Sequence, residues 1–212
     1  LCGPTSTITK SIVPLQQITT GVAPNNGLGD GASVYFDLDV TNPMGVSIES
    51  LDIFGSVSSV PFTIDMYVKP GTYTGFEGTA AEWAMVGTAA GTTNGTATTV
   101  PSNALFPQTI YLPPGQHGIK LHYLGTGPRY TTGSGILSWS NSDVTLTAGT
   151  SRGTSTTNPW SGSNITPRWF AGTIYYGTHN ISGNADYGTF GPGCAGTLGV
   201  SSLANSAKPV IG

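Results

Sequence analysis

In Val34-Tyr35-Phe36-Asp37-Leu38-Asp39-Val40, apolar side chains occupy every second position. Successive side chains of a β-strand point to opposite faces, so the apolar set faces one way and the two aspartates face the other. Half-buried strands of this kind belong to antiparallel sheets that pack one face inward. The stretch therefore predicts an antiparallel β-protein.

The same alternation recurs in 62–68, 119–123 and 144–148. Two shorter apolar runs, 46–48 and 51–53, are out of phase with each other, which predicts a bulge or bend near Ser50. Weaker strand candidates are 8–20, 85–89, 109–112, 136–139 and 169–176. A single helical turn is expected at Ala80-Ala81-Glu82-Trp83.

Turn-forming residues separate these candidates, for example Asn94-Gly95 and Pro113-Pro114-Gly115. Many short strands between Gly/Pro turns predict an antiparallel β-sandwich, of the jelly-roll kind, with extended terminal segments. We expect an N-terminal extension at 1–19, the sandwich at 20–176 and a Gly-rich C-terminal extension at 177–212. Residues 150–164 are expected to form a long surface loop.

Charge is scarce. The chain has 7 Lys+Arg and 10 Asp+Glu among 212 residues, or 8%, against about a quarter in an average protein. Its net charge of −3 comes with no basic cluster, which argues against nucleic acid or an anionic membrane as a partner. No stretch reaches the roughly 18 apolar residues of a membrane span. An uncharged hydroxyl surface removes self-repulsion and tolerates close association.

The two cysteines, Cys2 and Cys194, stand near opposite ends of the chain in Gly/Pro-rich surroundings. A disulfide between them would clasp the termini of an extracellular protein. Buried free thiols and a disulfide between subunits are the alternatives. The start at Leu1 and the composition fit a secreted chain whose leader was removed. Glycans could be attached at three sequons, Asn94, Asn164 and Asn180.

No pattern of catalytic residues emerges, so we expect no enzyme and no cofactor. His117 and His122 are predicted as surface imidazoles, and their spacing does not indicate a metal site. The best carboxylate pair for hydrolysis is Glu77 with Glu82, although an ordinary polar loop is favoured there. Asp37 and Asp39 share a strand face and are expected to be solvated.

Aromatic residues offer the other candidate site. Tyr73, Trp83 and Trp160 are predicted to bind glycans, because exposed aromatic rings stack on the apolar faces of sugars. Trp139 and Trp169 lie in predicted strands and are expected in the core.

Several segments resemble uncharacterised β-sandwich modules of large secreted bacterial surface proteins. They include Gly71-Thr72-Tyr73-Thr74-Gly75-Phe76-Glu77, Ser140-Asn141-Ser142-Asp143-Val144-Thr145-Leu146-Thr147 and Pro167-Arg168-Trp169-Phe170-Ala171-Gly172-Thr173. The tail segment Gly191-Pro192-Gly193-Cys194-Ala195-Gly196 is similar to one found in such proteins. The resemblance implies secretion and a surface role, and it carries over no catalytic residue.

The sequence thus predicts a non-catalytic extracellular subunit that assembles with copies of itself into a surface layer, matrix or fibre. Ile8–Thr20 or Leu198–Ile211 could be donated as a strand to a neighbour's sheet. The alternative is a carbohydrate-binding module with a polysaccharide partner. A hydrolase ranks third.

Overall fold

The computed structural model describes residues 15–95 and 97–178, which belong to one compact unit, residues 13–179. This part is all-β, and its one helical element is the 3₁₀ turn η1 (Ala80–Glu82), where the sequence predicted a turn. The strands are β1 (Gln16–Thr19), β2 (Asn26–Gly27), β3 (Ser33–Val40), β4 (Val46–Ile53), β5 (Pro61–Pro70), β6 (Ala84–Thr92), β7 (Ser102–Leu112), β8 (Gly115–Leu124), β9 (Arg129–Thr132), β10 (Ser138–Ser140), β11 (Val144–Arg152), β12 (Asn164–Phe170) and β13 (Gly172–Thr178).

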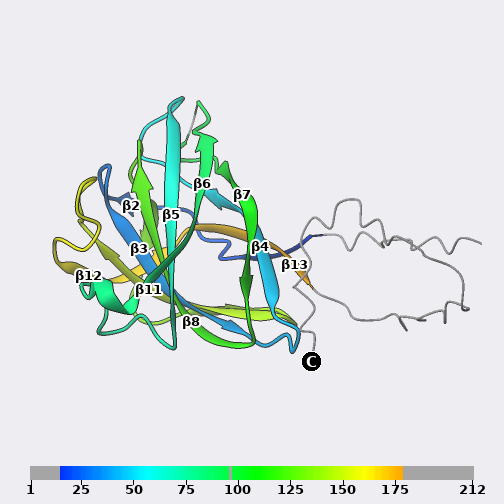
Figure 1. The fold of residues 1–212 in the computed structure, drawn as a ribbon. Helices are drawn as coiled ribbons and strands as arrows, with labels where there is room; N and C mark the ends of the chain where they lie inside the picture. Colours follow the sequence, from blue (N-terminus) through cyan, green and yellow to red (C-terminus); the bar gives the residue numbers. More distant parts are fainter. Residues whose placement is uncertain (1–14, 96, 179–212) are drawn as a thin grey trace, which may run out of the picture. The chain divides into compact units, whose positions relative to one another are not determined.

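The strands form one antiparallel sheet that curls into a half-barrel (Figure 1). The order is β1-β13-β4-β7-β6-β5-β8-β3-β11-β12-β9-β2, and β10 pairs with β11 beside this path. The predicted all-β antiparallel class is confirmed. No helix among the described residues has the length and hydropathy of a membrane span.

The inner face of the curled sheet holds the hydrophobic core. The apolar side chains of β3 that the alternation predicted, from Val34 to Val40, are all buried there. Phe36 stacks on Phe170 with ring centroids 5.1 Å apart, which ties β3 to β12. Burial of such side chains is the main force that holds the sheet curled.

Most predicted strands are present. The pairing of β4 with β7 shifts register between Ile48 and Ser50, which confirms the predicted bulge. The candidate 169–176 is two strands, β12 and β13, that meet at Ala171. In the candidate 8–20, the described strand is β1, which pairs with β13 of the same chain and so belongs to the sheet.

Regular strand pairing is sparse between β6 and β7. β6 pairs with β5 along its length, but it bridges to β7 only at Ala90 and Leu105. Large apolar side chains on these two strands are exposed to solvent. They are Met85, Val86, Leu105 and Tyr111, and we call them the β6–β7 patch.

Candidate functional site

A second hydrophobic cluster, made mostly of aromatic side chains, lies on the outward side of the sheet. We call it the outer cluster, and it consists of Tyr35, Tyr67, Tyr73, Trp83, Lys120 and Trp160. Lys120 on β8 is in register with Tyr67 on β5 and with Tyr35 on β3. The three side chains therefore form a row across adjacent strands, with the lysine in the middle.

Two connections cover this row. The first strap, residues 71–83, joins β5 to β6, and the second strap, residues 153–163, joins β11 to β12. Trp83 of the first strap packs edge-on against Tyr35, with ring centroids 5.8 Å apart. It also contacts Trp160 of the second strap, at 6.1 Å. The two straps thus meet above the row.

Asp37 fixes the first strap to β3. Its Oδ1 accepts a hydrogen bond from the Tyr73 backbone N–H at 2.8 Å, and its Oδ2 accepts one from the Thr72 hydroxyl at 2.7 Å. Gly118 permits the close approach, because an added Cβ would lie 2.7 Å from the Tyr73 nitrogen. Burial raises the pKa of Asp37, and these hydrogen bonds act in the opposite direction. Asp37 is therefore a structural anchor, and the expectation that it is solvated was wrong.

Lys120 is completely buried. Its ammonium donates a hydrogen bond to the Pro159 carbonyl oxygen of the second strap. Aromatic rings surround it, with centroids 3.4 Å away for Trp160, 4.8 Å for Tyr67 and 5.7 Å for Tyr35. Cation–π attraction thus replaces the carboxylate partner that a buried ammonium commonly has.

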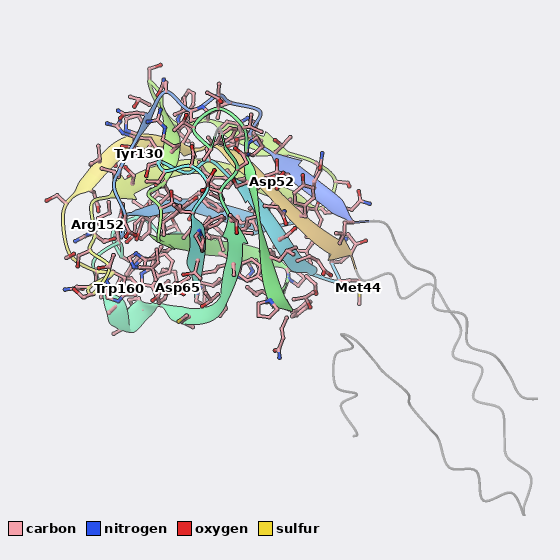
Figure 2. The ribbon with its side chains drawn as sticks, turned by 90° about the horizontal axis from the view of Figure 1, so that it is seen from above. Met44, Asp52, Asp65, Tyr130, Arg152 and Trp160 are labelled. Carbon is pink, nitrogen blue, oxygen red and sulfur yellow. The ribbon has the colours of Figure 1, made fainter. Side chains whose placement is uncertain are left out.

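Burial lowers the pKa of Lys120 to about 7. The charge of Arg152 lowers it further, while Asp65 acts in the opposite direction. Figure 2 shows Arg152 and Trp160 at the same end of the structure. Arg152 also holds the second strap, because its Nε donates to the Ser161 carbonyl at 2.7 Å.

With a pKa of about 7, the side-chain amine of Lys120 is close to half protonated near neutral pH.

His122 and Ser33 form a contact that resembles an activated nucleophile. Ser33 Oγ lies 3.1 Å from His122 Nδ1, and Thr154 of the second strap contacts the same nitrogen. Burial lowers the pKa of His122 to about 4, with a further contribution from the charge of Lys120. However, Ser33 and His122 are 0% and 1% exposed. A substrate cannot reach this hydroxyl, so the contact serves packing.

A pocket of about 270 Å³ lies elsewhere, next to β1 and β13. Its walls come from Thr19, Val22, Phe54, Pro101 and Thr173, together with nearby small residues. None of the lining residues carries an ionisable side chain. This pocket therefore brings no acid–base chemistry to a bound molecule.

The structure brings together the three residues predicted to bind glycans, but it places them in the outer cluster. Tyr73 and Trp83 are buried, and Trp160 is half-buried over Lys120. Trp139 and Trp169 were expected in the core. Trp139 is half-buried and packs against the core cluster, and it contacts Trp169, which is also half-buried. The exposure of Trp83 and Trp160 depends on the two straps, whose position over β8 alternation in the sequence does not reveal.

The histidine prediction was wrong for His117 and His122, which are both buried. His122 lies on the outward face of β8, which alternation alone marks as solvent-facing, and Thr154 of the second strap contacts it there. His117 is in register with the core residue Leu38 and so lies on the inner face, where its Nε2 contacts the Pro113 carbonyl at 2.8 Å.

Glu77 is buried and Glu82 is exposed, so they do not share one environment. Within the described ranges, no group of three or more His, Cys, Asp or Glu could hold a metal ion.

The sequons differ in what their amides do. Both Asn94 side-chain N–H groups are engaged, with the carbonyls of Val100 and Pro101 at 2.9 and 2.7 Å. Asn164 is exposed, and its carbonyl accepts a hydrogen bond from Arg152. The remaining predicted residues lie outside the described part of the chain; they are Cys2, Cys194 and Asn180.

The comparisons with known proteins assign nothing to these features. The sequence matches no protein-family model and no curated protein.

Proposed function

We propose that this chain is a non-catalytic, extracellular structural subunit that associates with copies of itself. The observation that supports the proposal best is the distribution of charge. Among the charged residues of the described ranges, only Asp30, Asp39 and Glu82 are exposed. A surface with so few ions exerts little repulsion on a second copy.

The lysine and arginine side chains of the described residues are buried or half-buried. Lys69 and Lys120 are buried, and three arginines are half-buried. Lys69 donates to the carbonyls of Pro70 and Thr72, at 2.7 and 2.8 Å. Lys120 and Arg152 likewise bond carbonyls of the second strap. Because none of these cations is exposed, they give the strands little protection against pairing with another chain.

The β6–β7 patch supplies an apolar surface for contact with a second copy. Leu105 is 62% exposed, and Tyr111 and Met85 are each more than half exposed. Large exposed apolar side chains on a soluble domain favour association with another surface. The patch lies where pairing between neighbouring strands is reduced to one bridge.

A more specific form of the proposal is that each copy donates a terminal strand to the sheet of its neighbour. Gln16–Thr19 already pairs with its own β13, so the donor segment that remains is Leu198–Ile211, which lies outside the described residues. A donated strand adds backbone hydrogen bonds to a neighbour's sheet edge.

For the fold, we propose that the half-barrel is a variant of the sandwich that the sequence predicted. Strands β4, β7 and β13 and strands β3, β8 and β11 contribute to the same core cluster, as two facing layers of a sandwich would.

Sedimentation velocity of the full chain over a range of concentrations tests the proposal. We expect assemblies in the wild type that the Leu105→Glu substitution weakens by about tenfold or more, because it introduces charge into the β6–β7 patch. Val57→Glu is the control, since Val57 is 48% exposed and lies outside the patch. A wild type that remains monomeric would overturn self-association. Deletion of 198–212 without effect on assembly would overturn strand donation alone.

A further inference from the structure

We propose that Trp139 and Trp169 form a binding surface for an uncharged polysaccharide. Trp139 lies on β10 and Trp169 on β12, two short strands that pair with successive parts of β11. Their ring centroids are 6.3 Å apart with an interplanar angle of 78°. Both indoles are half-buried, so each ring is anchored in the protein and still partly open to solvent.

The Trp169 ring is held in place before any ligand binds. Its Nε1–H donates to the Gly135 carbonyl at 2.9 Å. The ring also lies against Gly133, where an added Cβ would come within 2.0 Å of ring atoms. A ring fixed in this way loses little conformational entropy when a sugar stacks on it. The indole N–H is already hydrogen-bonded, so the part of the half-buried ring that solvent reaches is apolar.

The surroundings are apolar or neutral. Ile136, between Gly135 and Leu137, is 82% exposed, and Leu137 is 39% exposed. Ser134 and Thr132 are exposed neutral residues of the same loop and of β9. An arrangement of aromatic and aliphatic surface with hydroxyl groups nearby suits a pyranose, whose ring faces are apolar and whose edges carry hydroxyls.

Charge determines which ligand fits. Arg168, next to Trp169 along β12, is half-buried with its guanidinium over the Tyr130 ring, 5.5 Å from the centroid. Every lysine and arginine of the described ranges is buried or half-buried. Anionic polysaccharides, nucleic acids and anionic lipids depend on exposed cations. A neutral polysaccharide does not, and it is the ligand class whose charge matches this surface.

The site is separate from the outer cluster and from the β6–β7 patch. Trp160, one of the three residues predicted from the sequence to bind glycans, has its ring over the Lys120 ammonium. The proposal therefore places polysaccharide binding on a different pair of tryptophans, and it does not depend on self-association.

Affinity electrophoresis and pull-down of the full chain with cellulose, chitin, xylan and laminarin test the site, and alginate serves as the anionic comparison. We expect binding to at least one neutral polysaccharide. Trp169→Ala should weaken it by about tenfold or more. Ile136→Ser should weaken it by a few-fold, and because Ile136 is exposed this variant keeps its fold. Trp160→Ala is the control and should bind as the wild type does.

Several results would overturn the proposal. These are no binding to any neutral polysaccharide, unchanged binding in both Trp169→Ala and Ile136→Ser, and equal binding of alginate. Loss of binding in Trp160→Ala alone would return the site to the outer cluster. If Ile136→Ser reduced sedimenting assemblies but left polysaccharide binding intact, the surface would be a contact between copies instead.

Discussion

The indole ring of Trp160 lies over the ammonium of Lys120, with 3.4 Å between Nζ and the ring centroid. The two residues come from β8 and from the second strap, 40 positions apart in the chain. Burial removes the lysine from water and so disfavours its charged form, although the rings and the Pro159 carbonyl attract the ammonium. This one contact links the closure of a strap to the protonation of an amine, and it makes the stability of the fold depend on pH.

We expect the free energy of unfolding to rise by about 2 kcal/mol between pH 7 and pH 9. The pKa of Lys120 is about 7 in the folded chain and 10.5 when exposed, so over this range the unfolded state binds more protons. Lys120→Met should remove this rise. Urea denaturation of both proteins at each pH measures it, and an equal slope in the variant would contradict the burial of the amine. Measurements stop at pH 9 because burial raises the pKa of Tyr35 and Tyr123, whose effect above pH 10 has the opposite sign.

His122 should make the protein acid-sensitive. Its pKa is about 4 in the folded chain against 6.5 when exposed, so stability falls as the pH drops through this interval. We expect His122→Gln to lose about 2 kcal/mol less than the wild type between pH 6.5 and pH 4. The difference between the two proteins isolates the histidine from the carboxylates, which titrate in both. A difference near zero would place the imidazole in solvent.

Asp37 and Asp39 offer a matched pair two positions apart on β3. Asp37→Ala leaves the Tyr73 N–H and the Thr72 hydroxyl without their acceptor, and it should destabilise the protein by about 2 kcal/mol. Asp39 is exposed, so Asp39→Ala should change stability by less than about 0.5 kcal/mol. Thermal melts of both variants measure this, and equal shifts would contradict the anchoring role of Asp37.

Gly118→Ala should displace the first strap, because the new methyl group would lie 2.7 Å from the Tyr73 nitrogen and 2.9 Å from its Cα. Backbone atoms cannot yield as a flexible side chain can, so we expect a loss of about 2 kcal/mol. Gly29→Ala is the control, since its added Cβ would meet nothing within 4 Å. Chemical denaturation measures both, and a neutral Gly118→Ala would show that the strap does not contact β8 closely.

Alternation in the sequence was sufficient to predict β3, β5, β8 and β11, because their inner faces need a continuous apolar row. It was less informative for β7. That strand begins at Ser102, although only 109–112 was predicted, and its residues around Pro107 lie in an interruption of its pairing with β4. Among the site residues, the aromatic composition of the straps was visible in the sequence, but their position over Lys120 was not.

The sequence by itself determined the class of structure, since a period of two in hydrophobicity fits only strands with one buried face. It also determined the lack of charge. Only the tertiary structure decided which polar faces stay dry, because the two straps cross strands that are distant in sequence and bury Asp37, Lys120 and His122 beneath them. The local sequence pattern indicates which face of a strand is polar. Whether that face is exposed depends on the segments, distant in sequence, that pack over it.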